Sequence, residues 1–327
     1  MKYQLTKPCL DNSEVEAVKR IMESGWLAEG KETRQFEKNL AEFVGAKFAV
    51  AVSNCTVALE LSLRASHILE QAIIIPSFTH PATIRAVLNA HCIPLLRDVS
   101  LETYNIEHEG YVSTIPVSWG GNPVYHANNI VVEDAACSLG AVKQGNYPLC
   151  FSFHPRKLIT TGEGGAITTN DEKLADNIRE LKNFGYSNCK FDDVRAAIGN
   201  SQLRKLPKII EERIRKAQIY DKLLEDVKNV KVPYKHELAL HTYQTYAIYI
   251  IKGNRDKIIH NLRQHGIECQ FGAYALHRLP AFKNFGRIGQ LRNSELLSQR
   301  LLALPMAYDL SEEDQNFIVE ALKRELS

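Results

Sequence analysis

The stretch 151–166, FSFHPRKLITTGEGGA, combines a lysine, a serine and a glycine-rich turn. Lys157 stands just before the turn, and Ser152 lies five residues upstream of it. This spacing offers a nucleophilic amine together with a hydroxyl that can bind a phosphate group. On this segment alone, a surface lysine before a turn between two strands is an equally simple interpretation.

Short apolar runs alternate with helical patterns on both sides of this stretch. We expect strands at 48–52, 73–75, 93–96, 113–117, 130–132 and 166–169, and helices at 12–22, 32–44, 57–67, 81–90 and 174–183. The apolar runs are continuous instead of alternating with polar residues, which is typical of strands buried on both faces. The pattern therefore predicts an α/β fold with a mostly parallel sheet covered by helices.

A long, highly charged helical segment, 202–227, separates this half from the rest of the chain. After it we expect a strand at 245–251, helices near 255–264 and 294–301, and a terminal helix that begins after Ser311. The order of elements predicts a large domain over residues 1–212 and a smaller C-terminal α/β domain over residues 213–327.

Composition limits the classes of partner. The 327 residues carry a net charge of only +2, so no large basic field is available to bind nucleic acid or an anionic membrane. We find no run of about 20 apolar residues that would span a bilayer. The seven cysteines are scattered without a C-x-x-C pair, which argues against a disulfide framework and a thiolate metal site. We therefore expect a cytoplasmic protein that acts on a small molecule, with no metal.

Two further motifs fall at the ends of predicted strands. Glu133 and Asp134 end one apolar run, where a carboxylate can pair with a cationic group of a ligand or simply cap a helix. The turn Ser53-Asn54-Cys55-Thr56 precedes a predicted helix, whose N–H groups favour a phosphate. An ordinary helix cap is the alternative for this turn as well.

His80 follows a third strand, in the motif PSFTHPAT at 76–83. Its ring could stack on a flat ligand, or it could be a surface or capping residue. Open α/β sheets bind ligands at the carboxyl ends of their strands. The order of the four motifs along one predicted sheet therefore favours one shared ligand site.

The chain resembles the DegT/DnrJ/EryC1/StrS family of sugar aminotransferases, which are fold-type I pyridoxal-phosphate enzymes. The motifs that carry the resemblance are Gly25-Trp26-Leu27, 53–61, 76–83, 133–136, 151–166, Ala196-Ala197-Ile198-Gly199 and Leu304-Pro305. They extend over nearly the whole sequence. The resemblance implies an enzyme that moves an amino group, with glutamate as the expected donor, to a nucleotide-linked keto-sugar through the pyridoxamine form of the cofactor.

The resemblance also assigns roles by position. The Schiff-base lysine falls on Lys157, the carboxylate that pairs with the pyridine nitrogen on Asp134, and the stacking ring on His80. Phosphate contacts fall on the turn Asn54-Cys55-Thr56 and on Ser152. A further asparagine, donated by the neighbouring subunit, matches Asn188 and implies a homodimer with shared active sites.

The sequence departs from the family pattern in three places. Cys55 replaces a glycine in the phosphate turn and would be strained if the backbone there needed a positive φ. Cys137 occupies the position near the phenolic oxygen of the cofactor, where the family has a stronger hydrogen-bonding group. The segment 183–193 is also shorter than usual, with Lys190 in place of an arginine.

Trp26, Tyr274 and His277 are candidates to line the sugar pocket. Trp26 and Tyr274 could equally be packing residues, and His277 an exposed loop side chain.

Three alternative functions remain open at this point. Some relatives in the family are sugar dehydratases, but they carry histidine where this chain retains Lys157. A non-catalytic scaffold or regulator is suggested by Cys55 and Cys137. A cysteine hydrolase built on Cys150 and His154 lacks a recognisable nucleophile elbow.

Overall fold

The computed structural model describes residues 1–185, 188–237 and 239–326. Its main sheet has two sets of strands. One set has the order β1 (Phe48–Val52), β7 (Gly165–Thr169), β6 (Leu149–Ser152), β5 (Glu133–Asp134), and the other has the order β12 (Gly286–Ile288), β4 (Ile93–Arg97), β2 (Ala72–Pro76). Parallel bridges from Ile74 to Thr114 and from Val117 to Asp134 connect the two sets.

The sheet is parallel except for β7, which runs antiparallel to both β1 and β6. The predicted mostly parallel sheet is therefore confirmed. β7 reverses because the loop 153–164 returns the chain directly, without the crossover helix that a parallel connection needs. The predicted strands at 113–117 and 130–132 form only isolated bridges with their neighbours. In the first of them Pro116 removes a backbone donor from the ladder.

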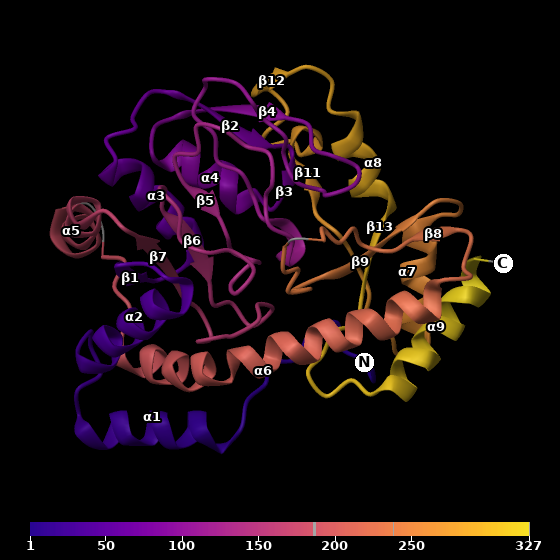
Figure 1. Cartoon of the computed structure of the whole chain (residues 1–327), viewed down its shortest axis with the longest axis horizontal. Helices are drawn as coiled ribbons and strands as arrows, with labels where there is room; N and C mark the ends of the chain where they lie inside the picture. Colours follow the sequence, from indigo (N-terminus) through magenta and orange to yellow (C-terminus); the bar gives the residue numbers. More distant parts are fainter. Residues whose placement is uncertain (186–187, 238, 327) are drawn as a thin grey trace.

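Helices cover both faces of the sheet (Figure 1). Those before the long helix are α1 (Asn12–Ser24), α2 (Lys31–Val44), α3 (Cys55–Ala65), α4 (Pro81–Asn89) and α5 (Glu172–Glu180), with a π-helical turn at Leu181–Gly185. Along β1, Val50 and Val52 belong to the core beneath α3 and α4, whereas Ala49 and Ala51 belong to the core beneath α2 and α6. Burial on both faces explains why the strand has no polar alternation.

The C-terminal part contains a second, antiparallel sheet with the order β10 (Gln270–Phe271), β13 (Leu301–Leu304), β9 (Tyr246–Ile250), β8 (Val230–Lys231). The helices of this part are α7 (Arg255–Gln264), α8 (Arg292–Arg300) and α9 (Glu312–Leu326). A short pair, β3 (Phe78–Thr79) with β11 (Tyr274–Ala275), joins it to the main sheet. Tyr274 and the segment before α4 are thereby neighbours.

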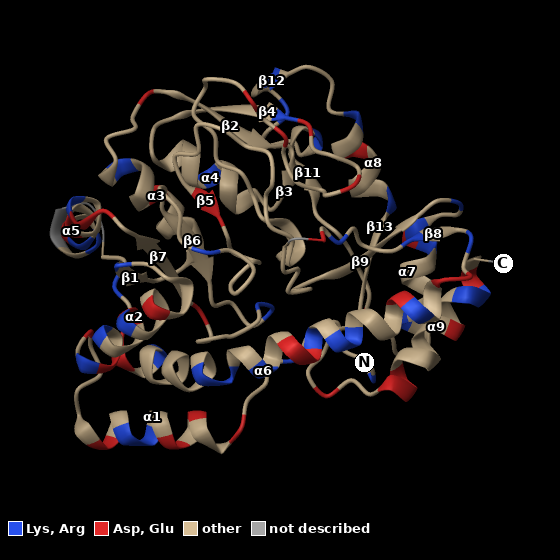
Figure 2. Ribbon diagram, in the orientation of Figure 1, with Lys and Arg blue, Asp and Glu red and all other residues tan. Residues whose placement is uncertain are grey.

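Helix α6 (Asp193–Leu224) runs from α1 and α2 to α9 (Figure 1). It passes through residue 212 without interruption, and Tyr3 from the N-terminus packs into the C-terminal core. The division at 212 stays a prediction. Figure 2 shows basic and acidic residues intermixed along the ribbons of α1 and α6. Among the described residues, no helix combines the length and apolarity needed to cross a membrane.

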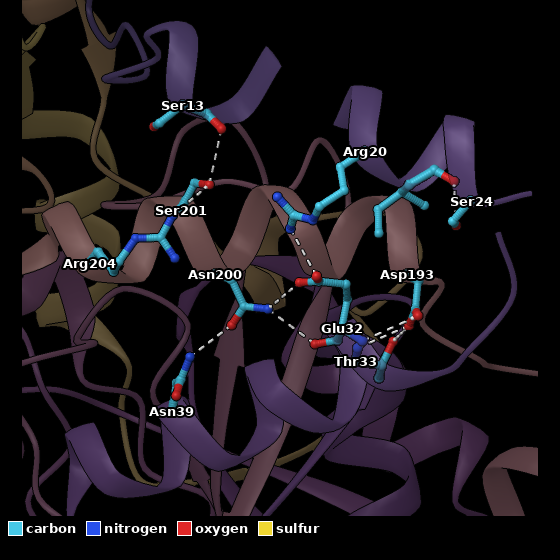
Figure 3. A network of polar contacts seen from close by, with 11 residues as sticks. Ser13, Arg20, Ser24, Glu32, Thr33, Asn39, Asp193, Asn200, Ser201 and Arg204 are labelled. Atoms are coloured by element: carbon cyan, nitrogen blue, oxygen red, sulfur yellow. Dashed lines mark hydrogen bonds and ion pairs between the residues drawn. The ribbon is translucent and has the colours of Figure 1, made fainter. Parts of the chain in front are cut away.

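Asp193 anchors the start of α2 from a distant part of the sequence (Figure 3). The N-cap of α2 is Gly30, which has no side chain to accept from the first turn. The Asp193 carboxylate accepts instead from Gly30 N at 2.7 Å, Thr33 N at 2.9 Å and Thr33 Oγ1 at 2.7 Å. A buried carboxylate at a helix N-terminus also interacts favourably with the helix dipole. This contact holds the 25–30 segment, which contains Trp26, against α6.

Candidate active site

Strand β5 is an acidic segment in the middle of the sheet (Figure 2). Glu133 and Asp134 are both buried, and consecutive strand residues point to opposite faces. Glu133 Oε1 accepts from Ser118 Oγ at 2.5 Å, and burial raises the pKa of Glu133 to about 7. Asp134 instead accepts from Thr83 Oγ1 at 2.7 Å and from Ala136 N at 3.2 Å. The two carboxylates therefore have separate environments.

Burial also raises the pKa of Asp134, although its two donors, the charge of Lys157 and, when it is protonated, His80 act in the opposite direction. Both hydrogen-bond donors are neutral groups. A buried carboxylate whose two hydrogen-bond donors are both neutral retains its charge for a cationic ligand group.

Lys157 lies in the loop between β6 and β7, and its side chain is half-buried. Its Nζ is 3.1 Å from Cys137 Sγ. Burial alone would lower the pKa of Lys157, but Cys137 and Asp134 outweigh it, and the net direction is upward. The amine is thus held as an ammonium until another group replaces this contact.

The turn at the start of α3 has the geometry of an anion site. Asn54 is the N-cap, and its Oδ1 accepts from Val57 N at 3.0 Å. Cys55 is the first residue of the helix and does not have a positive φ. The condition under which cysteine would be strained here is therefore not met, because a helical backbone at this position accommodates a side chain. The remaining N–H groups of the first turn are available to a phosphate.

Gly165 allows this turn to approach the sheet. It pairs with Val52 in the β1–β7 ladder. A Cβ at position 165 would lie 2.4 Å from Asn54 C and 2.6 Å from Cys55 N, both of them backbone atoms that cannot rotate away. The glycine is required by close packing and not by its φ angle. Any side chain there would displace the predicted phosphate turn.

His80 takes the capping role that its sequence left open, while its stacking role stays a prediction. It is the N-cap of α4, with its ring Nδ1 accepting from Ala82 N at 3.1 Å. Its ring centroid is 6.3 Å from that of Tyr274. Partial desolvation, followed by the positive charge of Lys157, lowers the pKa of His80. A neutral ring next to the lysine and Asp134 is consistent with stacking on a flat cofactor.

The remaining predicted residues are placed differently. Ser152 ends β6 and pairs with Gly165, so it lies beside the phosphate turn. Asn188 is exposed, and the next residue, Cys189, accepts through its carbonyl from Ser53 N at 3.0 Å. The Asn188 segment therefore adjoins the same turn.

His277 and Trp26, the two other candidates for the sugar pocket, are less directly connected to the residues described above. His277 is buried, contrary to the exposed-loop interpretation, with Nδ1 2.7 Å from Ser77 Oγ and Nε2 2.9 Å from Glu295 Oε1. Both of its ring nitrogens already have partners. Trp26 is 62% exposed and lies against Gly30 near the start of α6. Their roles in substrate binding stay predictions.

Two residues of the site were not assigned from sequence. Thr83 contacts Asp134 directly, and Gly165 supports the phosphate turn. Both stand inside quoted motifs, but their identity alone does not show what they contact. Among the described residues there is also no cluster of side chains suited to hold a metal ion.

Comparison with known proteins identifies the family of this chain. The sequence model of the DegT/DnrJ/EryC1/StrS aminotransferase family matches residues 8–115 and 126–323. The chain belongs to this family. It is therefore a pyridoxal-phosphate-dependent sugar aminotransferase with the fold-type I architecture.

Individual proteins are similar to this chain over nearly its whole length. The chain is 30% identical to GDP-perosamine synthase of Caulobacter vibrioides, over 99% of this chain and 98% of that protein. It is 30% identical to a DegT/DnrJ/EryC1/StrS aminotransferase from Brucella abortus, with a TM-score of 0.87 over 96% of this chain and 95% of that one. The Escherichia coli GDP-4-keto-6-deoxy-D-mannose-3-dehydratase with bound hydrated pyridoxal phosphate shares the fold, with a TM-score of 0.89 at 22% identity over 98% and 99% of the two chains.

Proposed function

We propose that this enzyme transfers an amino group from glutamate to a keto-sugar linked to a nucleotide. The observation that carries the proposal is the convergence of Lys157, Asp134 and the N-terminus of α3. The charge of Lys157 lowers the pKa of Asp134, and the charge of Asp134 raises the pKa of Lys157. Both charges also act on the pKa of Cys55 at the start of α3. An amine, a carboxylate and an anion site in one place match the three polar parts of pyridoxal phosphate.

The residues of the site would hold the cofactor at three points. Asp134 pairs with the pyridine nitrogen, the α3 turn and Ser152 bind the phosphate, and His80 covers the ring. The cofactor, when bound, withdraws electrons from the substrate carbon that loses a proton. The buried position of Asp134 strengthens its attraction for a positive nitrogen, because few water molecules compete for the carboxylate.

Lys157 then serves as the proton carrier. Its Nζ would have to be neutral to accept a proton from the α-carbon of the amino donor. In the cofactor-free protein the neighbouring acidic groups favour its ammonium form, so binding of the cofactor must be accompanied by loss of a proton. Burial supports this change, because it opposes the charged amine.

Dehydration of the sugar is the second candidate, since a dehydratase shares the fold. Lys157 favours amino transfer, because the resemblance to the family implies that its dehydratases carry histidine at this position. The proposal also includes a cytoplasmic location, supported by seven unpaired thiols.

A substrate screen tests the reaction type. The purified enzyme with pyridoxal phosphate is incubated with isotope-labelled glutamate and a set of nucleotide-linked keto-sugars. We expect the labelled nitrogen to appear in one sugar product, detected by mass spectrometry. A product that has lost water and contains no label would identify a dehydratase, and no product from any sugar would contradict both candidates.

Shared active sites are tested through Asn188. We expect Asn188→Ala to weaken cofactor binding about 10-fold or more, because it would remove a hydrogen bond to a phosphate. A heterodimer of one Lys157→Ala subunit and one Asn188→Ala subunit would then contain one intact site and show about half of the wild-type activity.

The mixed dimer separates the two geometries. If Asn188 acted within its own subunit, no site of the heterodimer would be intact, and its activity would not exceed that of Asn188→Ala. A protein that stays monomeric at assay concentration would also contradict the proposal.

A further inference from the structure

Two buried threonines form a hydrogen-bonded chain that ends on Asp134. Thr79 Oγ1 and Thr83 Oγ1 are 3.2 Å apart, and Thr83 Oγ1 is 2.7 Å from Asp134 Oδ2. Thr79 is 1% exposed, and Thr83 is fully buried. The chain of hydroxyls is thus closed to solvent, and no water can replace either donor without displacing protein atoms.

The direction of donation along these hydrogen bonds follows from the single hydrogen that each threonine hydroxyl carries. An ionised carboxylate only accepts, so Thr83 must give its single hydroxyl hydrogen to Asp134. The bond between the two threonines then requires Thr79 to donate and Thr83 to accept. Thr79 therefore fixes the rotation of the Thr83 hydroxyl toward the carboxylate.

The two hydrogen-bonded hydroxyl groups also connect two sides of the site. Thr79 lies in β3, pairs with Tyr274 of β11 and directly precedes His80. Thr83 lies in the first turn of α4, opposite the end of β5. The segment that presents His80 and the strand that presents Asp134 are thus linked through two hydroxyl groups.

We propose that Thr83, oriented by Thr79, is a positioning residue that keeps Asp134 ionised and directed at the cofactor's pyridine nitrogen. The inference rests on the proposed role of Asp134. Oδ1 is held by Ala136 N and Oδ2 by Thr83, so both oxygens have a fixed donor. Without Thr83, one oxygen of a buried carboxylate would have no partner, which favours its protonated form.

The charged and titratable groups around Asp134 come from every neighbouring element. They are Lys157 in the β6–β7 loop, His80 at the start of α4, Cys55 in α3, Cys150 in β6 and Glu133 in β5 itself. Lys157, and His80 when it is protonated, favour the carboxylate, while the others oppose a further negative charge. Variants of Thr83 leave all of these groups in place.

The test compares Thr83→Val, which keeps the shape but removes the hydroxyl, with Thr83→Ser, which keeps the hydroxyl. We expect Thr83→Val to weaken pyridoxal phosphate binding about 10-fold or more. The pH midpoint of the absorbance change of the bound cofactor should also move upward, because the carboxylate becomes protonated at a higher pH. Thr83→Ser should restore both values, and Thr79→Val should give a smaller change in the same direction.

A matched control is Thr168→Val, at a buried threonine whose hydroxyl donates to the neutral amide of Gln144 at 2.7 Å. It should cost stability without moving the pH midpoint. If Thr83→Val has the same affinity and midpoint as this control, the inference is overturned. It is equally overturned if Thr83→Ser behaves like Thr83→Val, since the methyl group and not the hydroxyl would then matter.

A second measurement needs no cofactor. Asp134 has a raised pKa in the folded protein, so its ionised form costs folding stability as the pH rises through that value. Thr83→Val should enlarge this cost, and its loss of stability should be greater at about pH 8 than at about pH 5. A loss that is equal at both pH values would also overturn the inference. If the wild type failed to bind pyridoxal phosphate at all, the proposed function would fail, while this measurement would still judge Thr83.

Discussion

Replacing Lys157 with alanine should reduce amino transfer by at least about 10⁴-fold, because the site would lose the residue proposed as both its covalent anchor and its proton carrier. The absorbance band that a protein-linked cofactor shows should disappear as well. Pyridoxal phosphate could still bind through Asp134 and the α3 turn, so binding should weaken without being lost. Steady-state assays and absorbance spectra after incubation with the cofactor measure the two effects.

A matched control for this prediction is Lys143→Ala. Lys143 is exposed, and its Nζ is 3.3 Å from the carbonyl oxygen of Phe43, away from the site. This variant should retain wild-type activity and spectrum. An active Lys157→Ala enzyme with an unchanged spectrum would contradict the assignment of the lysine.

Asp134→Asn should reduce the rate by about 10²- to 10³-fold, the range seen when a buried electrostatic partner of a reacting group is removed. The amide has nearly the shape of the carboxylate but cannot hold a proton on the pyridine nitrogen by charge. The loss should therefore appear mainly in kcat, with little change in the affinity for the sugar. Rapid mixing of the loaded enzyme with glutamate would show the slowed step directly.

Stability separates this loss from unfolding. The ionised Asp134 costs stability at neutral pH because its pKa is raised by burial. The cofactor-free Asp134→Asn variant should thus melt at the same temperature as the wild type or higher. Glu133→Gln, on the other face of β5, is the control and should leave the rate unchanged; a comparable rate loss there would mean that the strand, and not the Asp134 charge, was affected.

Much of the fold was predictable from local patterns. The strand at 48–52 and the helix at 255–264 have the predicted bounds, because an apolar run and a capped amphipathic segment are visible in consecutive residues. The segments 113–117 and 130–132 were predicted as strands but form only bridges, since apolar content does not show whether a ladder continues. The reversed direction of β7 was not visible either, because residue patterns are the same for both directions.

The turn at 54–56, predicted to bind phosphate, shows the same limit of local sequence patterns. Cys55 suggested strain from its sequence position alone, but the helix begins at this residue and its backbone is ordinary. The constraint on this turn lies instead at Gly165, 110 positions away in the chain, where a Cβ would collide with the turn. A sequence position shows which residue is present, whereas a collision depends on two segments being brought together.

By itself, the sequence determined the kinds of chemical group that this protein carries and the order in which they follow its strands: Lys157, Asp134, His80 and the turn at 54–56. Only the tertiary structure decided that Thr83 donates to Asp134, that Cys137 contacts Lys157, and that His277 is buried between Ser77 and Glu295. The physical reason is that helices, strands and turns depend on neighbours along the chain. The protonation and orientation of a buried side chain depend on neighbours in space, which the folding of distant segments supplies.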